Sequence, residues 1–145
     1  MIYANQSERK YRHMQTQWKT RRFSDVFIVD ASGSLTSGEG LTAVREEISK
    51  LVNSGATRII LNMRAVTQLD NASVGELAAS YSTVLFLGGQ IKLLHVDSKA
   101  LGMLLIAKLH MVFDIFGDEA EAVASFRRPR HTDLQMASRA EVFIG

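Results

Sequence analysis

The chain has 145 residues, of which 46% are hydrophobic and 22% charged, and its formal net charge is +2. This balance is typical of one soluble globular domain that is long enough to bury a core. The absence of cysteine excludes a disulfide framework and thiolate chemistry. The apolar runs are too short to predict a membrane span, and the polar start predicts no signal peptide, so we expect a cytoplasmic protein.

The positive charge is concentrated at the two ends of the chain. Residues 1–22 hold six basic residues and one acidic residue, residues 127–145 hold four and two, and residues 23–126 hold seven and twelve. An acidic core does not favour nucleic-acid binding. We expect a basic extension over 1–15, one domain over 16–127 and a tail over 128–145. Solvated ends are the simplest interpretation, and contact with an acidic partner, a membrane surface or RNA stays open.

The first half of the domain predicts a hairpin followed by a loop and a helix. Residues 16–23 and 26–31 have the composition of two strands around a turn at Ser24-Asp25, with the first strand at a sheet edge. Residues 32–40 are small and glycine-rich and predict a flexible binding loop without phosphate-binding glycine spacing. Apolar residues at helical spacing predict a helix over 41–52.

The second half of the domain alternates strands and helices. We expect strands over 58–63, 90–96 and 110–113, and helices over 72–87, 98–109 and 118–126. Such alternation predicts an α/β fold in which much of the sheet is parallel and covered by helices.

The stretch from Val66 to Leu77 joins a buried strand to a helix. Asp70 and Asn71 lie where the spacing of apolar residues changes from that of a strand to that of a helix, and both are good N-cap residues. A helix start offers unpaired N–H groups and the positive end of the helix dipole, so it suits an anionic partner. Capping and partner contact are both open for Asp70, and the two roles can coexist.

Residues that carry chemistry are sparse. The four histidines have no ligand-like spacing, and the chain lacks a Walker loop and a nucleophile elbow. We predict no catalytic residue, no cofactor and no metal ion. A small enzyme or ligand carrier would need an enclosed pocket with converging polar groups, and no sequence pattern supplies that polar set.

The segment Leu69-Asp70-Asn71-Ala72-Ser73-Val74-Gly75-Glu76-Leu77 resembles the signature of STAS domains, the anti-sigma-factor antagonists. The signature is an Asp, two hydroxyl residues, Gly, an aliphatic residue and Gly or Ala, often followed by Glu-Leu. The resemblance extends from about residue 16 to 126, and the segments 88–94 and 108–116 are similar to the small bacterial antagonists. It implies a STAS sandwich, an α/β fold with a mixed sheet and helices chiefly on one face.

In that family, a serine kinase that is also the anti-sigma factor phosphorylates the second hydroxyl residue, and the unphosphorylated antagonist binds this partner and frees the sigma factor. The chain departs from the pattern here, because Asn71 holds the first hydroxyl position, Ala72 the acceptor position and Ser73 the glycine position. Three hypotheses follow. The chain binds its partner without phosphorylation control, Ser73 has become the acceptor, or the domain no longer meets a kinase.

The resemblance implies an anti-sigma-factor antagonist whose partner has a kinase-type ATPase fold, and self-association as a dimer is open. The alternative is a non-switching STAS scaffold or a regulatory subunit of a stress-sensing or transport complex. The partner surface is expected at the helix start and the neighbouring loop. Its predicted residues are Gly33, Ser34, Thr36, Asp70, Asn71, Ala72, Ser73 and Glu76.

Overall fold

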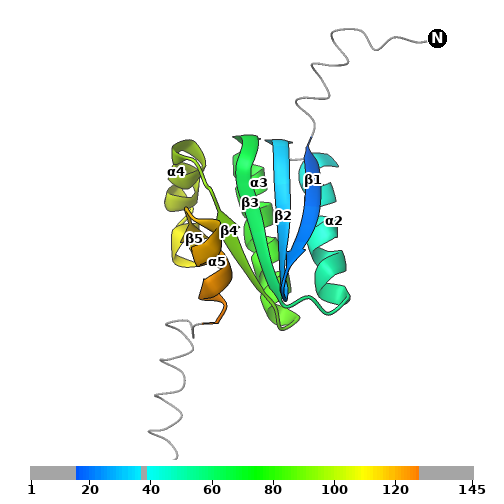
Figure 1. The fold of residues 1–145 in the computed structure, drawn as a ribbon. Helices are drawn as coiled ribbons and strands as arrows, with labels where there is room; N and C mark the ends of the chain where they lie inside the picture. Colours follow the sequence, from blue (N-terminus) through cyan, green and yellow to red (C-terminus); the bar gives the residue numbers. More distant parts are fainter. Residues whose placement is uncertain (1–15, 37–38, 128–145) are drawn as a thin grey trace, which may run out of the picture.

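A computed structural model describes residues 16–36 and 39–127 of the chain. They form one sheet with the strand order β1-β2-β3-β4-β5, and helices cover both of its faces (Figure 1). The elements in chain order are β1 (Gln17–Phe23), β2 (Val26–Leu35), α2 (Glu39–Asn53), β3 (Arg58–Leu69), α3 (Asn71–Phe86), β4 (Gln90–Leu94), α4 (Ser98–Ile106), the 3-10 helix η1 (Leu109–Met111), β5 (Ile115–Phe116) and α5 (Glu119–Ser125).

The sheet is mixed, as expected. β1 lies at an edge and pairs with β2 in antiparallel fashion, whereas β2, β3, β4 and β5 run parallel to one another. Helices α2, α3 and α4 pack on one face and α5 packs on the other, so the prediction of helices chiefly on one face is confirmed. In a parallel arrangement, the carboxyl ends of β2, β3 and β4 meet at one edge of the sheet.

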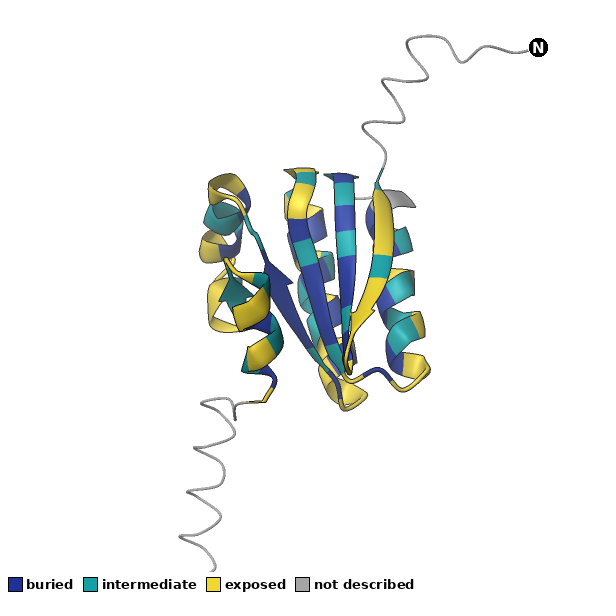
Figure 2. Cartoon of the chain, in the orientation of Figure 1, coloured by how far each residue is buried: buried dark blue, intermediate teal, exposed yellow. Residues whose placement is uncertain are grey.

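Alternation along the strands divides the core between the two faces. On β3, Leu61 belongs to the large cluster under α2, α3 and α4, while its neighbour Ile60 belongs to the smaller cluster under α5. Both side chains are fully buried, as is most of the first half of β3 (Figure 2). β1 is largely exposed, as its charged sequence requires.

A polar network joins β1, β2 and α5 on the smaller face. The Arg21 guanidinium donates to Asp30, with Nε 2.6 Å from Oδ2, and it also pairs with Glu119. Partial burial pushes the pKa of Asp30 upward, but hydrogen bonds from Arg21 and Asn62 outweigh this and leave that pKa below its ordinary value. The hydrogen bond from Arg21 likewise lowers the pKa of Glu119. This network ties α5 to the edge hairpin.

A lysine is buried beneath α5. Lys92 on β4 is only 3% exposed, and its Nζ donates to Ser125 Oγ at 2.7 Å and lies 3.5 Å from Asp114 Oδ2. The same ammonium lies 4.5 Å from the centre of the Phe126 ring, at the distance of a cation–π contact. Lys92 therefore fixes α5 and the loop before β5 to the sheet.

Two strands are longer than expected. β2 continues through Leu35 and β3 through Leu69, although residues 32–40 were expected as a loop and the central strand was expected to end at 63. The extensions pair with each other past two irregularities of register, with Ser34 opposite Gln68 and Leu35 opposite Leu69. Pairing between neighbouring strands decides where these two strands end. The polar side chains of the extensions interrupt the apolar pattern from which strand length is predicted, so the sequence alone indicates shorter strands.

The strand expected over 110–113 is wrong. Residues 109–111 form η1, and the strand that pairs with β4 is Ile115–Phe116. Lys108 adopts a left-handed conformation with φ of 59° and turns the chain after α4. Phe113 is buried in the core although it lies outside any strand. Together with its apolar neighbours it gives the sequence the composition of a short strand.

The predicted extension over 1–15 and the tail over 128–145 lie outside the described residues, and the domain boundaries stay predictions. Within 16–36 and 39–127, no helix combines the length and apolar character that a bilayer crossing requires. The same residues contain no cluster of three or more metal-ligating side chains.

Candidate functional site

The site is built at the start of α3, at the sheet edge where the parallel strands end. Asp70 is the N-cap, with φ of −117° and ψ of 173°, and its carboxylate accepts a hydrogen bond from the Ser73 N–H at 2.8 Å. Asn71 and Ala72 follow in the first turn, and both are exposed. The capping geometry expected from the sequence is present, and it leaves the tip of the helix on the surface.

Ser73 lies on the inner side of the same turn. It is 0% exposed, and its hydroxyl donates to Asp70 Oδ1 at 2.5 Å. The carboxylate of Asp70 therefore satisfies both the amide and the hydroxyl of one residue. Phosphorylation of Ser73 stays a prediction, and in this arrangement it would require the hydroxyl to leave Asp70 and reach the surface.

The end of β2 lies beside this helix start. Ser34 Oγ is 3.1 Å from Thr36 Oγ1 and 3.3 Å from Gln68 Oε1, and Leu35 pairs with Leu69, the residue before Asp70. Parallel pairing thus brings the two predicted segments to one edge. Ser34 and Thr36 are half-buried and reach the surface.

Gly33 differs from its neighbours in this segment because it is buried. Its φ of 82° is in the region that favours glycine, and it lies where the register between β2 and β3 shifts. Its place in the structure is therefore that of a residue that shapes the strand end, and the prediction that it contacts a partner is untested.

Glu76 lies one turn after Ser73 and forms an ion pair with Arg45 of α2. Both side chains are a little over two-fifths exposed, at 43% and 45%. A pair this exposed contributes little to stability, about 0.2–1 kcal/mol. Its effect on the site is to place a positive and a negative charge together on the flank of the helix start.

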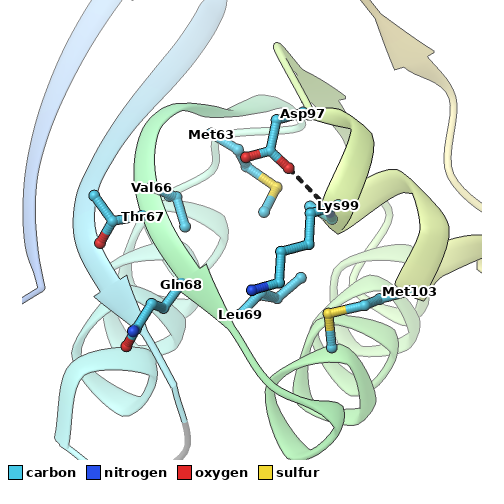
Figure 3. A pocket seen from close by; sticks show the side chains of 9 residues that line it. Met63, Val66, Thr67, Gln68, Leu69, Asp97, Lys99 and Met103 are labelled. Atoms are coloured by element: carbon cyan, nitrogen blue, oxygen red, sulfur yellow. Dashed lines mark hydrogen bonds between the residues drawn. The ribbon is translucent and has the colours of Figure 1, made fainter.

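A shallow hollow lies between the end of β3 and the start of α4 (Figure 3). Apolar side chains of Met63, Val66 and Leu69 from β3 and Met103 from α4 line it. At its rim Asp97 caps α4, accepting a hydrogen bond from the Ala100 N–H at 2.8 Å, and the Lys99 side chain extends across the opening. The hollow adds an apolar patch beside a charged helix tip.

The arrangement combines features that suit the binding of a partner. His95 and His110, the two histidines that the structure describes, belong to no ligand cluster. The helix start presents N–H groups and the positive end of a dipole, flanked by hydroxyl groups from β2 and an apolar hollow. Sequence reasoning missed Met63, Lys99 and Met103, because nothing in their local pattern shows that β3 and α4 meet here.

Residues 17–122 match the model of the STAS domain family. No curated protein matches the chain in sequence. The family match covers every described residue of the candidate site and most of the sheet and helices around it.

Solved structures with a similar fold include three in which nearly the whole of the other chain aligns with this one. A protein of Thermotoga maritima aligns with a TM-score of 0.70 at 21% identity, over 77% of this chain and 95% of that chain. An anti-sigma factor antagonist from Mycobacterium paratuberculosis aligns with a TM-score of 0.67 at 17% identity, over 79% and 96%. The Bacillus anti-sigma factor antagonist SpoIIAA in its unphosphorylated form aligns with a TM-score of 0.66 at 19% identity, over 77% and 96%. At these identities the similarity establishes the fold.

Proposed function

The chain belongs to the STAS domain family, and from this premise we propose that it is an anti-sigma-factor antagonist that binds its partner with the start of α3. The observation that carries the proposal is the exposed first turn, where Asn71 and Ala72 stand on the surface beside the capping carboxylate of Asp70. This turn holds the residues that resemble the family signature. The partner would be an anti-sigma factor with a kinase-type ATPase fold.

Binding without phosphorylation control is the version of this function that we propose. Ala72 holds the position of the family's phosphoacceptor and has no hydroxyl, and the neighbouring Ser73 hydroxyl is buried against Asp70. A phosphate would add about −1.5 to −2 charges to a contact surface. Without an accessible acceptor, the amounts of antagonist and anti-sigma factor would set how much sigma factor is free.

The mechanism requires only competition between two protein partners. The antagonist occupies the anti-sigma factor, and the sigma factor is released because the two complexes exclude each other. The hydroxyl groups of Ser34 and Thr36 and the hollow beside Lys99 would contribute to the same contact surface. No bond is made or broken by the antagonist in this scheme.

The substitution Ala72→Glu tests the surface directly. It places a negative charge at the acceptor position, and a carboxylate in the first turn of a helix does not destabilise the fold. We expect affinity for the anti-sigma factor, measured by calorimetry, to fall by at least about tenfold, an effect typical of a central contact residue. The melting temperature should stay unchanged or rise slightly.

The matched control is Ser82→Glu, which adds the same charge to an exposed position of α3. Ten residues of helix put it about 15 Å from Ala72 along the axis. We expect this variant to bind like the parent chain. Equal affinity for all three proteins would reject the α3 start as the partner surface.

A second candidate function, a scaffold that assembles with copies of itself, is favoured by exposed apolar side chains away from the α3 start. Phe86 at the end of α3 is 89% exposed, Ile106 at the end of α4 is 87% exposed, and Met111 in η1 is 78% exposed. An association surface commonly forms where such side chains gather. Light scattering after size exclusion distinguishes the two, because a scaffold forms large assemblies and an antagonist is a monomer or dimer.

A further inference from the structure

A cleft lies between α2 and α3. It has a volume of about 230 Å³ and lies where the two helices pack with small side chains. A bound water needs about 10–15 Å³ of such space, so the cleft is large enough for a small organic molecule. Its lining residues are Arg45, Ile48 and Ser49 from α2 and Ala79, Ser80, Thr83 and Val84 from α3.

Ser80 is the unusual group in this lining. The residue is only 5% exposed, and its hydroxyl has no hydrogen-bond partner among the described residues. Buried polar groups in folded proteins are almost always paired, with protein, ordered water or a ligand. A buried hydroxyl without a protein partner in the wall of a cleft therefore points to an occupant with a polar atom.

The other walls define the chemistry of that occupant. Ile48 and Val84 supply an apolar floor, since both are buried in the core. Thr83 uses its proton in a hydrogen bond to the Ala79 carbonyl at 3.0 Å, so its oxygen can act only as an acceptor toward the cleft. The cleft thus combines an apolar body with a few hydroxyl groups.

Arg45 adds a positive charge at the cleft. Among the described residues it has one ion pair, through Nη1 to Glu76, which leaves donors on Nε and Nη2 for a second anion. A guanidinium can hold a carboxylate with two parallel hydrogen bonds. The anion would sit between α2 and α3, within reach of the Glu76 pair that flanks the α3 start.

We propose that this cleft is a binding site for a small organic carboxylate. The carboxylate pairs with Arg45, the apolar body lies on Ile48 and Val84, and a polar atom satisfies Ser80. The site does not depend on the proposed partner surface, because neither Asp70 nor Ala72 lines it. For a molecule of this size we expect a dissociation constant on the order of a millimolar.

Benzoate and benzamide are suitable probes, because they have the same shape and differ in charge. We would titrate each into the full-length chain labelled with ¹⁵N and follow the backbone amide signals. Benzoate is expected to shift the signals of the cleft residues in a saturable manner, and benzamide should bind there a few-fold more weakly. A cleft that holds only water would show no localised, saturable shift with either probe, and this result would overturn the proposal.

Variants of the two walls locate the site. Ser80→Leu fills the cleft from α3 and Ser49→Leu fills it from α2, so a failure of one variant to fold leaves the other. Both are expected to abolish benzoate binding. Arg45→Gln should remove the preference for benzoate over benzamide, whereas Arg64→Gln, which removes an exposed arginine from β3, should not. Benzoate binding that survives both leucine variants would reject the cleft as the site.

Discussion

The starts of α3 and α4 can be compared directly, because both helices follow parallel strands and begin at the same edge of the sheet. Asp70 and Asp97 cap them in the same way, each accepting a hydrogen bond of 2.8 Å from the amide three residues on. The helices differ at that third residue, which is Ser73 in α3 and Ala100 in α4. Only in α3 does the capping carboxylate also hold a buried hydroxyl.

This comparison shows which features of the two helix starts are explained by capping alone. Capping explains an aspartate at both positions, so the presence of Asp70 in the signature is not by itself a sign of partner contact. What distinguishes α3 is the pair of small exposed residues after the cap, whereas α4 continues with Ser98 and the charged Lys99. The two tips therefore serve as matched test and control.

The largest effect is expected for Asp70→Ala. The helix loses its cap and the buried Ser73 hydroxyl loses its acceptor, so the free energy of unfolding should fall by about 2 kcal/mol in urea denaturation. Affinity for the anti-sigma factor should fall about tenfold if the carboxylate is part of the surface. Asp70→Asn keeps an acceptor oxygen and removes the charge, so it shows which of the two properties the partner requires.

Asp97→Ala is the matched control at the other tip. It removes a cap with one hydrogen bond, and we expect a loss of about 1 kcal/mol in the free energy of unfolding. Partner affinity should fall less than in Asp70→Ala, because the Asp97 carboxylate lies at the rim of the hollow and not at the α3 start. A loss of affinity equal to that of Asp70→Ala would show that the partner does not distinguish the two tips.

Ser73→Ala makes the third residue of α3 resemble that of α4. The amide hydrogen bond to Asp70 remains, and only the hydroxyl is lost, so we expect a destabilisation of about 1 kcal/mol or less. Incubation of the parent chain with a cognate kinase and ATP, followed by mass spectrometry, should give no added phosphate. A mass gain that disappears in Ser73→Ala would contradict binding without phosphorylation control.

The smallest effect is expected for Arg21→Gln, which removes the cation of the network that joins β1, β2 and α5. Its effect on the pH dependence of stability defines the pH range in which variants of the two helix starts should be compared. The pKa values of Asp30 and Glu119 are lowered in the folded state, so they contribute stability above their unfolded values of about 4 and lose it as the pH falls through the folded values. Arg21→Gln should cost less than about 1 kcal/mol at pH 7. Its unfolding free energy should also fall less than that of the parent chain between pH 5 and pH 3.

Much of the fold was predictable because its signals are local. The hairpin turn at Ser24-Asp25, the edge position of the first strand and the cap at Asp70 depend on a few neighbouring residues. The ends of β2 and β3 were not predictable in this way, because their polar residues become strand only by pairing with each other. The misplaced strand at 110–113 has a similar origin, since an apolar turn and a short strand have the same composition.

The sequence by itself determined the α/β alternation, the family signature and the capped start of α3, because each is written in residues close together in the chain. The tertiary structure decided that Ser73 faces inward, that α5 is fixed by Arg21 and Lys92, and that Arg45 and Ser80 line one cleft. These features depend on the packing of elements that are distant in sequence. Such packing is set by the fit of whole helix and sheet surfaces, and no local pattern of residues records it.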